Sequence, residues 1–185
     1  DEGKYRLWRD TGLASMPSGT SVALADQTVG YESNEDVDNG FRPEGLIRLS
    51  TTVGPTPEYL LDYGNEVGAG TTEHHVTLYR APSGALVFSS GSVQWGWGLD
   101  SEHDGDPVPA DLRMQQAQVN LLADMGAQPG SLMAGLVPAT PSTDSTAPNT
   151  VINAPTEGAV VAHGSEVTVT GTASDAAGRV AGVEV

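Results

Sequence analysis

The first 136 residues alternate short apolar runs with Gly, Pro, Asn and Asp, a pattern typical of short strands joined by turns. Leu46–Val53 alternates apolar and polar positions and is rich in β-branched residues, which predicts a strand. Pro55 and Pro57 should end that strand, because proline cannot donate to a ladder. The shorter elements predicted nearby are strands at 21–24 and 28–32 and a helical turn at 58–63.

Two further patterns are stronger. Residues 75–80 and 85–88 flank the turn Pro82-Ser83-Gly84, which predicts a β-hairpin. Residues 111–125 have helical spacing, with Pro109 before them and Gly126 after them as start and stop signals. The face predicted to be buried consists of Met114, Ala117, Leu121, Leu122 and Met125. One amphipathic helix beside several strands indicates an α/β or α+β layer.

The composition changes at Val137. Residues 137–148 are rich in Pro, Ser and Thr and have no apolar period, which predicts an extended linker. Residues 149–185 then show strands about every ten residues between turn signals, as in an immunoglobulin-like β-sandwich. The strands predicted there after 151–152 are 159–161, 166–173 and 180–185. A sandwich needs about 100 residues, so we expect 149–185 to be a truncated Ig-like domain.

Charge narrows the classes of partner. The formal net charge is −16 and the chain has no cysteine. An acidic surface repels phosphate backbones, so we expect no nucleic-acid partner. The chain has no apolar run long enough to span a membrane, and it offers no disulfide or thiolate chemistry. The first residues lack the layout of a signal peptide and an initiator Met, so we expect the true start to lie upstream.

Two long stretches carry a resemblance to a known family. One is Gly30–Ser50 (GYESNEDVDNGFRPEGLIRLS), and the other runs from Leu78 through Gly91–Asp100 (GSVQWGWGLD) to Arg113–Ala117. Residues 1–136 thereby resemble the C-terminal part of the C-terminal domain of the N,N-dimethylformamidase large (beta) subunit family. The resemblance implies a partial glutamine-amidotransferase-like α/β fold. Similar bacterial secreted proteins continue into Ig-like domains, which implies a secreted, extracellular protein.

The same resemblance implies hydrolysis of amide C–N bonds with a mononuclear iron held by two tyrosines and a glutamate. That glutamate belongs to a His-x-Glu element, and this sequence contains none. We therefore expect no cofactor within these residues, iron only in the full-length protein, and a requirement for the upstream part of the same domain. The piece alone should be inactive.

The candidate pocket residues lie where strands are predicted to end. Trp95 and Trp97 are two apart, so an extended backbone would direct both to one side, with Asp100 closing that segment. Tyr31 and Glu32 end another predicted strand, where a carboxylate can serve as a general base or a ligand. Core aromatics and a solvated Glu are the plain structural alternatives.

A weak calcium pattern follows. Oxygen ligands fall at relative positions one, three, five and twelve, with Gly105 at six. The residues are Asp100, Glu102, Asp104 and Asp111. An exposed loop before the helix is the alternative, since Asp is short for position twelve and prolines interrupt the loop.

Two functional hypotheses result. The first is a part of an amide hydrolase acting on a small amide. The second is a non-catalytic extracellular module that binds a polysaccharide or cell surface or acts as a spacer. Exposed Trp95 or Trp97 on a flat face would favour the second, and a cleft with converging Tyr and carboxylates would favour the first.

Overall fold

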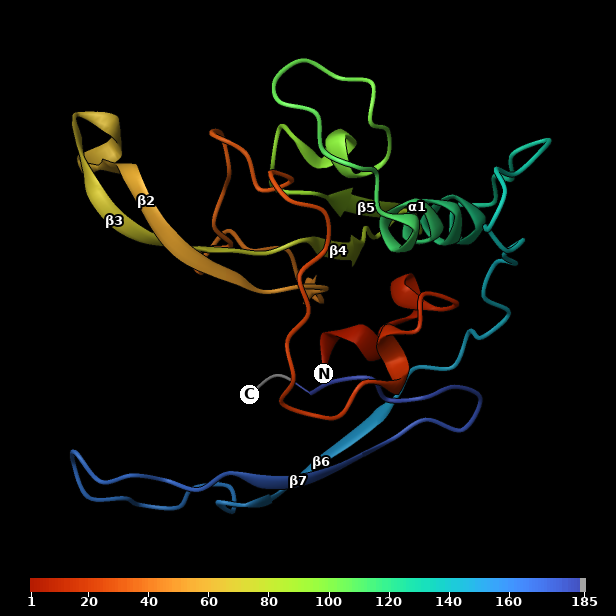
Figure 1. Cartoon of the computed structure of the whole chain (residues 1–185). Coiled ribbons are helices and arrows are strands. Elements are labelled where there is room, and N and C mark those ends of the chain that lie inside the picture. Colours follow the sequence, from red (N-terminus) through yellow and green to blue (C-terminus); the bar gives the residue numbers. More distant parts are fainter. Residues whose placement is uncertain (184–185) are drawn as a thin grey trace. The chain divides into compact units, whose positions relative to one another are not determined.

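The computed structural model describes residues 1–183, which fall into two compact units, Asp1–Pro141 (unit 1) and Ser142–Val185 (unit 2). Unit 1 is built mainly from small antiparallel sheets and one α-helix (Figure 1). Its elements in chain order are η1 (Glu2–Lys4), η2 (Arg6–Trp8), η3 (Leu13–Ser15), β1 (Ile47–Arg48), β2 (Thr52–Leu61), η4 (Asp62–Gly64), β3 (Glu66–His74), β4 (Thr77–Arg80), β5 (Leu86–Ser89), η5 (Trp95–Gly98) and α1 (Leu112–Asp124).

The predicted hairpin forms the centre of a three-stranded antiparallel sheet with the order β1-β4-β5. Leu78 of β4 pairs with Phe88 of β5 on one side and with Ile47 of β1 on the other. The turn is closed by a hydrogen bond from Ala81 N–H to the Ala85 carbonyl (2.8 Å). This hairpin is confirmed, whereas the strand predicted over Leu46–Val53 is divided between β1 and the start of β2.

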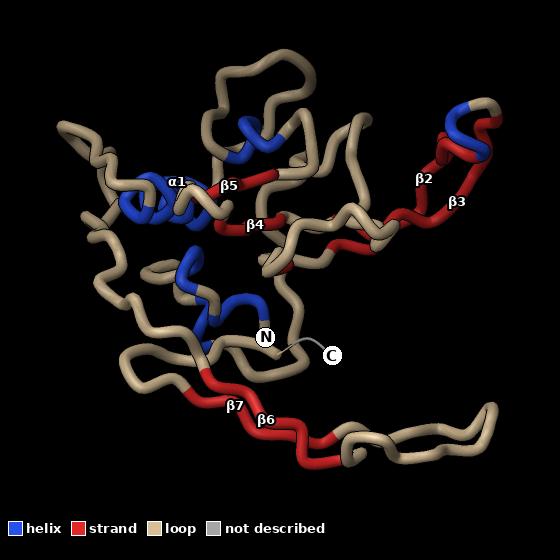
Figure 2. The backbone as a smooth tube through the Cα atoms, turned by 180° about the vertical axis from the view of Figure 1, so that it is seen from behind, coloured by secondary structure: helices blue, strands red, loops and turns tan. Residues whose placement is uncertain are grey.

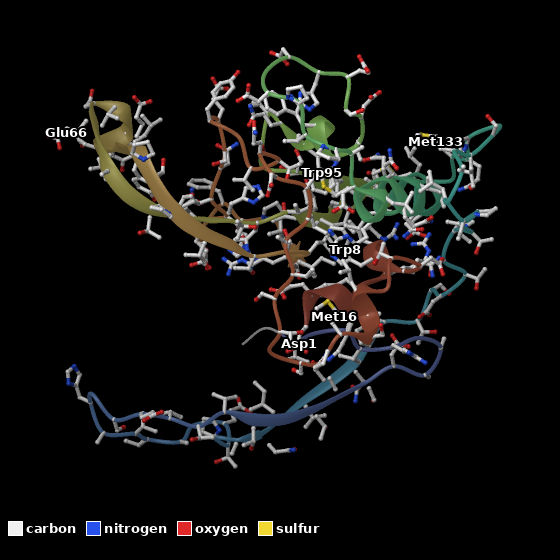
Figure 3. The ribbon with its side chains drawn as sticks, in the orientation of Figure 1. Asp1, Trp8, Met16, Glu66, Trp95 and Met133 are labelled. Carbon is white, nitrogen blue, oxygen red and sulfur yellow. The ribbon has the colours of Figure 1, made fainter. Side chains whose placement is uncertain are left out.

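The core of unit 1 lies between this sheet, α1 and the N-terminal turns. Its buried members are Leu7, Trp8, Leu49, Val76, Ala117 and Leu121. Trp8 is 2% exposed, and its indole N–H donates to the Leu49 carbonyl at 2.7 Å. The apolar ring is therefore buried without leaving its polar group unpaired. Figure 3 shows Trp8 and Trp95 directed into the interior of the unit.

The helix α1 confirms the sequence prediction. Asp111 caps its start by accepting the Arg113 N–H at 2.8 Å. Gly126 (φ 83°) ends it in the left-handed region, and Ala127 N–H donates to the Leu122 carbonyl at 2.8 Å. The predicted apolar face holds for Met114, Ala117 and Leu121, but the side chains of Leu122 and Met125 are 37% and 43% exposed.

Two buried amides on α1 replace those apolar contacts. Asn120 is fully buried and donates to the carbonyls of Leu7 (2.8 Å) and Arg9 (2.7 Å). Gln116 exchanges hydrogen bonds with the backbone of Val137, at 2.8 and 2.9 Å. The helix thus holds both the N-terminal segment and the segment that leaves unit 1. Residues 137–140 therefore belong to unit 1 rather than to an extended linker, and Ala139 packs with Val119 and Ala123.

The long hairpin β2–β3, called the arm, extends away from the rest of unit 1 (Figures 1 and 2). The prediction that Pro55 and Pro57 end the strand is wrong, because β2 continues through both to Leu61. The arm has only two strands, so a residue without N–H can face the open edge. The pairing register also shifts between Thr56 and Tyr59, next to Pro57. The predicted helical turn at 58–63 is correspondingly reduced to η4 at the tip.

The strands predicted at 21–24 and 28–32 do not form. Leu24 instead packs against the core from an irregular segment. The chain near 28–32 makes isolated antiparallel bridges slightly later, Ser33 with Ser92 and Glu35 with His74. The apolar pattern there indicated residues that pack on the core, such as Leu24. Which residues pair as strands is decided by segments about 40 to 60 residues away in the sequence.

Unit 2 contains the antiparallel pair β6 (Asn149–Ala154) and β7 (Thr170–Ser174). The strand predicted at 159–161 does not form, and residues 180–183 are also outside strands; residues 184–185 lie outside the described part. None of the described residues of unit 2 is a buried hydrophobic one. The pair is consistent with part of an Ig-like β region. Across residues 1–183, no helix is long and apolar enough to cross a bilayer.

Candidate functional site

The larger cleft of unit 1 has a volume of about 700 Å³. Three segments line it: residues 30–35 with Val37, the arm, and residues 89–93 at the end of β5. Tyr31 and Glu32 are among the lining residues, so the structure places these two candidates together. From the arm the cleft receives Thr56, Glu58, Tyr59, Leu60 and Thr72.

Backbone hydrogen bonds join the first wall of the cleft, residues 30–37, to the third wall, residues 89–93. Asn34 N–H donates to the Gly91 carbonyl at 2.8 Å, and Val93 N–H donates to the Glu32 carbonyl at 3.1 Å. Gly30 N–H donates to the Ser92 hydroxyl at 2.9 Å. Tyr31 and Glu32 therefore stand on backbone that is bonded at both ends, while their side chains remain exposed.

Glu35 joins that wall to both strands of the arm. Its carboxylate accepts the Glu73 N–H of β3 at 3.0 Å and the Tyr59 hydroxyl of β2 at 2.7 Å. These two hydrogen bonds, first that from Glu73 and then that from Tyr59, hold the pKa of Glu35 below its ordinary value. Conversely, the hydrogen bond to Glu35 raises the pKa of Tyr59. At neutral pH the pair is a carboxylate and a neutral phenol.

His74 lies behind the third wall. Its Nε2–H donates to the Ser90 carbonyl at 2.8 Å, and its Nδ1 is buried without a hydrogen-bond partner. Burial lowers the pKa of His74, so the neutral imidazole is favoured. Gly91 is required in front of it: its φ is 63°, and a Cβ there would come within 2.9 Å of His74 Nε2 and of the His75 carbonyl.

The cleft has a single sign of charge. Glu32, Glu35 and Glu58 line it, and none of the lining residues is Lys, Arg or His. The nearby Arg42 and Arg48 do not line the cleft, and both donate hydrogen bonds to the Asp36 carboxylate. The electrostatic potential in the cleft is therefore negative and favours positively charged ligands.

The two tryptophans lie outside the cleft lining. They belong to η5, a 3₁₀ turn with about three residues per turn, so residues two apart point in different directions and the predicted shared side is wrong. Trp95 makes an edge contact with Phe88 in the core (centroids 5.8 Å apart). Trp97 stacks on His103 (centroids 4.3 Å apart, planes at 8°). Asp100 is exposed after this turn and also lies outside the cleft lining.

The four calcium candidates do not converge. Asp100 accepts the Glu102 N–H at 2.9 Å, which is a local turn, and Glu102 and Asp104 are exposed. Asp111 caps α1 and is bonded to the Arg113 guanidinium. Within residues 1–183, no three His, Asp or Glu side chains are grouped closely enough to hold a metal ion.

Iron does not fit the Tyr–Glu pair of the cleft either. A tyrosine ligand binds a metal as phenolate, but Tyr59 donates its proton to Glu35 and its pKa is raised by that bond. Both Glu35 oxygens already accept hydrogen bonds. The pair is therefore a structural link between the wall and the arm.

Sequence reasoning missed Glu35, Glu58 and Tyr59 as parts of the cleft. Tyr59 falls in the helical turn predicted at 58–63, but it lies in strand β2, where its hydroxyl donates to Glu35 of residues 30–37. Glu35 lies in an acidic loop that resembles any solvated turn. Its one distinguishing feature, pairing with His74, is a long-range contact with no local signal.

Comparison with known proteins gives two matches. The family described as N,N-dimethylformamidase beta subunit-like, C-terminal, matches residues 1–107, and a bacterial Ig domain matches residues 148–185. No curated protein and no solved structure matches the chain at a significant level. The two matches confirm the families that the sequence resembles, and the first of them covers residues 1–107 of the predicted 1–136.

Proposed function

This chain belongs to the N,N-dimethylformamidase beta subunit-like C-terminal family, and from that premise we propose that unit 1 takes part in hydrolysis of amide carbon–nitrogen bonds. The structural observation that supports the proposal is the cleft in which Tyr31 and Glu32 lie beside the Tyr59–Glu35 pair. A cleft lined by tyrosines and carboxylates is the arrangement expected of an enzyme site rather than of a spacer.

In the proposed reaction Glu32 acts as the general base. It takes a proton from a water molecule whose oxygen attacks the amide carbon, and the carbon–nitrogen bond then breaks. The proton held by Glu32 passes to the leaving nitrogen, so the products are a carboxylic acid and an amine. Glu35 and Tyr59 position the wall, since each is already committed to the other.

The wider fold proposal is that unit 1 is part of a glutamine-amidotransferase-like α/β domain. The packing of α1 on the core beside the sheet supports it. The small sheets described in unit 1 pair antiparallel, so the parallel strands of such a domain would have to come from other segments.

For unit 2 we propose a spacer role outside the cell. The match to a bacterial Ig domain and the exposed Pro/Ser/Thr segment before it support an extended, secreted protein. Polysaccharide stacking on Trp95 or Trp97 loses its main support, because Trp95 packs in the core and Trp97 is stacked on His103.

The test uses the whole gene product and measures amine release from N,N-dimethylformamide and other small amides. We expect turnover, and we expect Glu32→Gln to lower kcat by about 10²- to 10⁴-fold with a smaller change in KM. Glu166→Gln in unit 2 is the matched control and should leave kcat unchanged. No turnover of any small amide, or equal kcat in Glu32→Gln, would contradict the proposal.

A further inference from the structure

The carboxylates of the cleft combine with aromatic rings. Tyr31 is 84% exposed and lines the cleft from one wall, and Tyr59 lines it from the arm. Glu32, Glu35 and Glu58 come from the same two walls. Tyrosine faces and carboxylates both attract cations, and together they are the groups that recognise substituted ammonium ions in proteins.

The spacing of the carboxylates distinguishes an organic cation from a metal ion. A bound metal needs oxygen ligands that converge within about 2.0 to 2.6 Å of one point. No three acidic or His side chains in residues 1–183 are grouped in that way. The three glutamates are instead distributed around a volume of about 700 Å³, enough for a molecule of several heavy atoms.

The acidic groups of the cleft have no basic partner in its lining. Glu35 is ionised because its two oxygens accept hydrogen bonds from Glu73 N–H and from Tyr59. Glu32 and Glu58 are exposed. With no Lys, Arg or His in the lining, nothing in the cleft neutralises these groups.

We propose that this cleft binds the ammonium group of an organic amine, and that it is the amine side of the substrate that lies between the tyrosines and the glutamates. The inference rests on the proposed amide hydrolysis and adds a substrate class to it. When the carbon–nitrogen bond breaks, the leaving nitrogen gains one proton and becomes an amine. The amine then takes a second proton, which the carboxylic acid product gives up, so the products at neutral pH are a carboxylate and a positively charged ammonium ion. The cleft stabilises that charge, and the released ammonium ion is a competitive product inhibitor.

The experiment compares two soluble isosteres, choline and its uncharged analogue 3,3-dimethyl-1-butanol, by NMR titration of the full chain. We expect choline to bind at least ten times more tightly than the alcohol, with an affinity that falls as salt is raised. Glu58→Gln and Glu32→Gln should each weaken choline binding about 3- to 10-fold, and Glu157→Gln in unit 2 should not change it.

The outcomes separate this inference from the proposed function. Equal binding of the alcohol and choline, or unchanged choline affinity in both cleft variants, overturns the ammonium site. A neutral oligosaccharide that occupies the cleft equally in wild type and variants also overturns it, in favour of a sugar site. Amide turnover without ammonium binding refutes the inference alone, whereas ammonium binding without turnover refutes the proposed function alone.

Discussion

Glu35 shows how one side chain can fix the geometry of a cleft. It binds the backbone of β3 and the hydroxyl of Tyr59 on β2, while its own backbone bridges to His74. Among the residues of β2 and β3, only His74 at the base of the arm is buried. The carboxylate therefore supplies much of what orients the arm over the wall.

The hydrogen bonds of Glu35 predict a pH-dependent stability. Its pKa is lowered in the folded state, so its contribution is present above the unfolded pKa, about 4.3, and is lost as the pH falls below that value through the folded pKa. At pH 7 we expect Glu35→Gln to lower the free energy of unfolding by about 0.5 to 1 kcal/mol, a small value because the site is near solvent.

The measurement is urea unfolding followed by tryptophan fluorescence at pH 7 and in the acid range. All three tryptophans lie in unit 1, so the signal reports that unit. The difference between wild type and Glu35→Gln should shrink in acid, and Glu102→Gln, an exposed loop carboxylate, should show no such trend. A difference that is constant with pH would exclude the carboxylate as its source.

At the scale of elements, α1 connects parts of the chain that are distant in sequence. Asp111 begins it. Burial acts to raise the pKa of the Asp111 carboxyl, but hydrogen bonds from the Arg113 side chain and backbone outweigh burial, so the pKa is lowered. Arg6 and Arg9 both bind Asp124 at the other end. In the middle, Asn120 holds the backbone of Leu7 and Arg9.

Removal of that amide should be costly. Asn120→Ala leaves the Leu7 and Arg9 carbonyls without their donor and removes one of the two acceptors of Gln116 Nε2. We therefore expect a loss of about 2 to 4 kcal/mol in the free energy of unfolding. Gln118→Ala, two residues before Asn120 at a half-buried position, is the matched control and should cost under about 0.5 kcal/mol. Since alanine favours the helix more than either residue that it replaces, equal losses in the two variants would show that the buried amide of Asn120 is not the source of the loss.

The elements differ in how far the sequence could predict them. The β4–β5 hairpin and α1 depend on local periodicity and on turn or cap residues, and both were predicted. The arm was missed because prolines usually end strands, and only a two-stranded ribbon with open edges tolerates them. Tyr31 and Glu32 were proposed as site residues from a predicted strand end, and they do line the cleft although that strand does not form. Glu35 and Tyr59, which also line it, are brought together by long-range pairing that leaves no local signal.

For the whole molecule, the division into two units is the dominant feature. Residues 137–140 are attached to α1 through Gln116, Ala139 and the Arg6 and Arg9 bonds to the Thr140 carbonyl. Residues 142–148 are exposed and lie outside helices and strands. The domain and linker bounds 1–136, 137–148 and 149–185 stay predictions. The contacts of residues 137–140 indicate that the chain becomes accessible to a protease only after them.

Limited proteolysis tests this accessibility. With a protease of broad specificity we expect the first cuts within residues 142–148, giving a product that keeps residues 137–140 and resists further cleavage. Mass spectrometry of the products over time identifies the sites. Early cuts at 137–140 would contradict the attachment to α1.

The bonds from Asn120 to Leu7 and Arg9 also set an order of events during synthesis. The paired residues are 113 and 111 positions apart, and ribosomes add about 5 to 20 residues per second. The N-terminal segment therefore leaves the ribosome roughly 5 to 20 seconds before its helix exists. Trp8, Leu7 and their neighbours spend that interval without their final cover, which makes the nascent chain a substrate for chaperones before it is a folded protein.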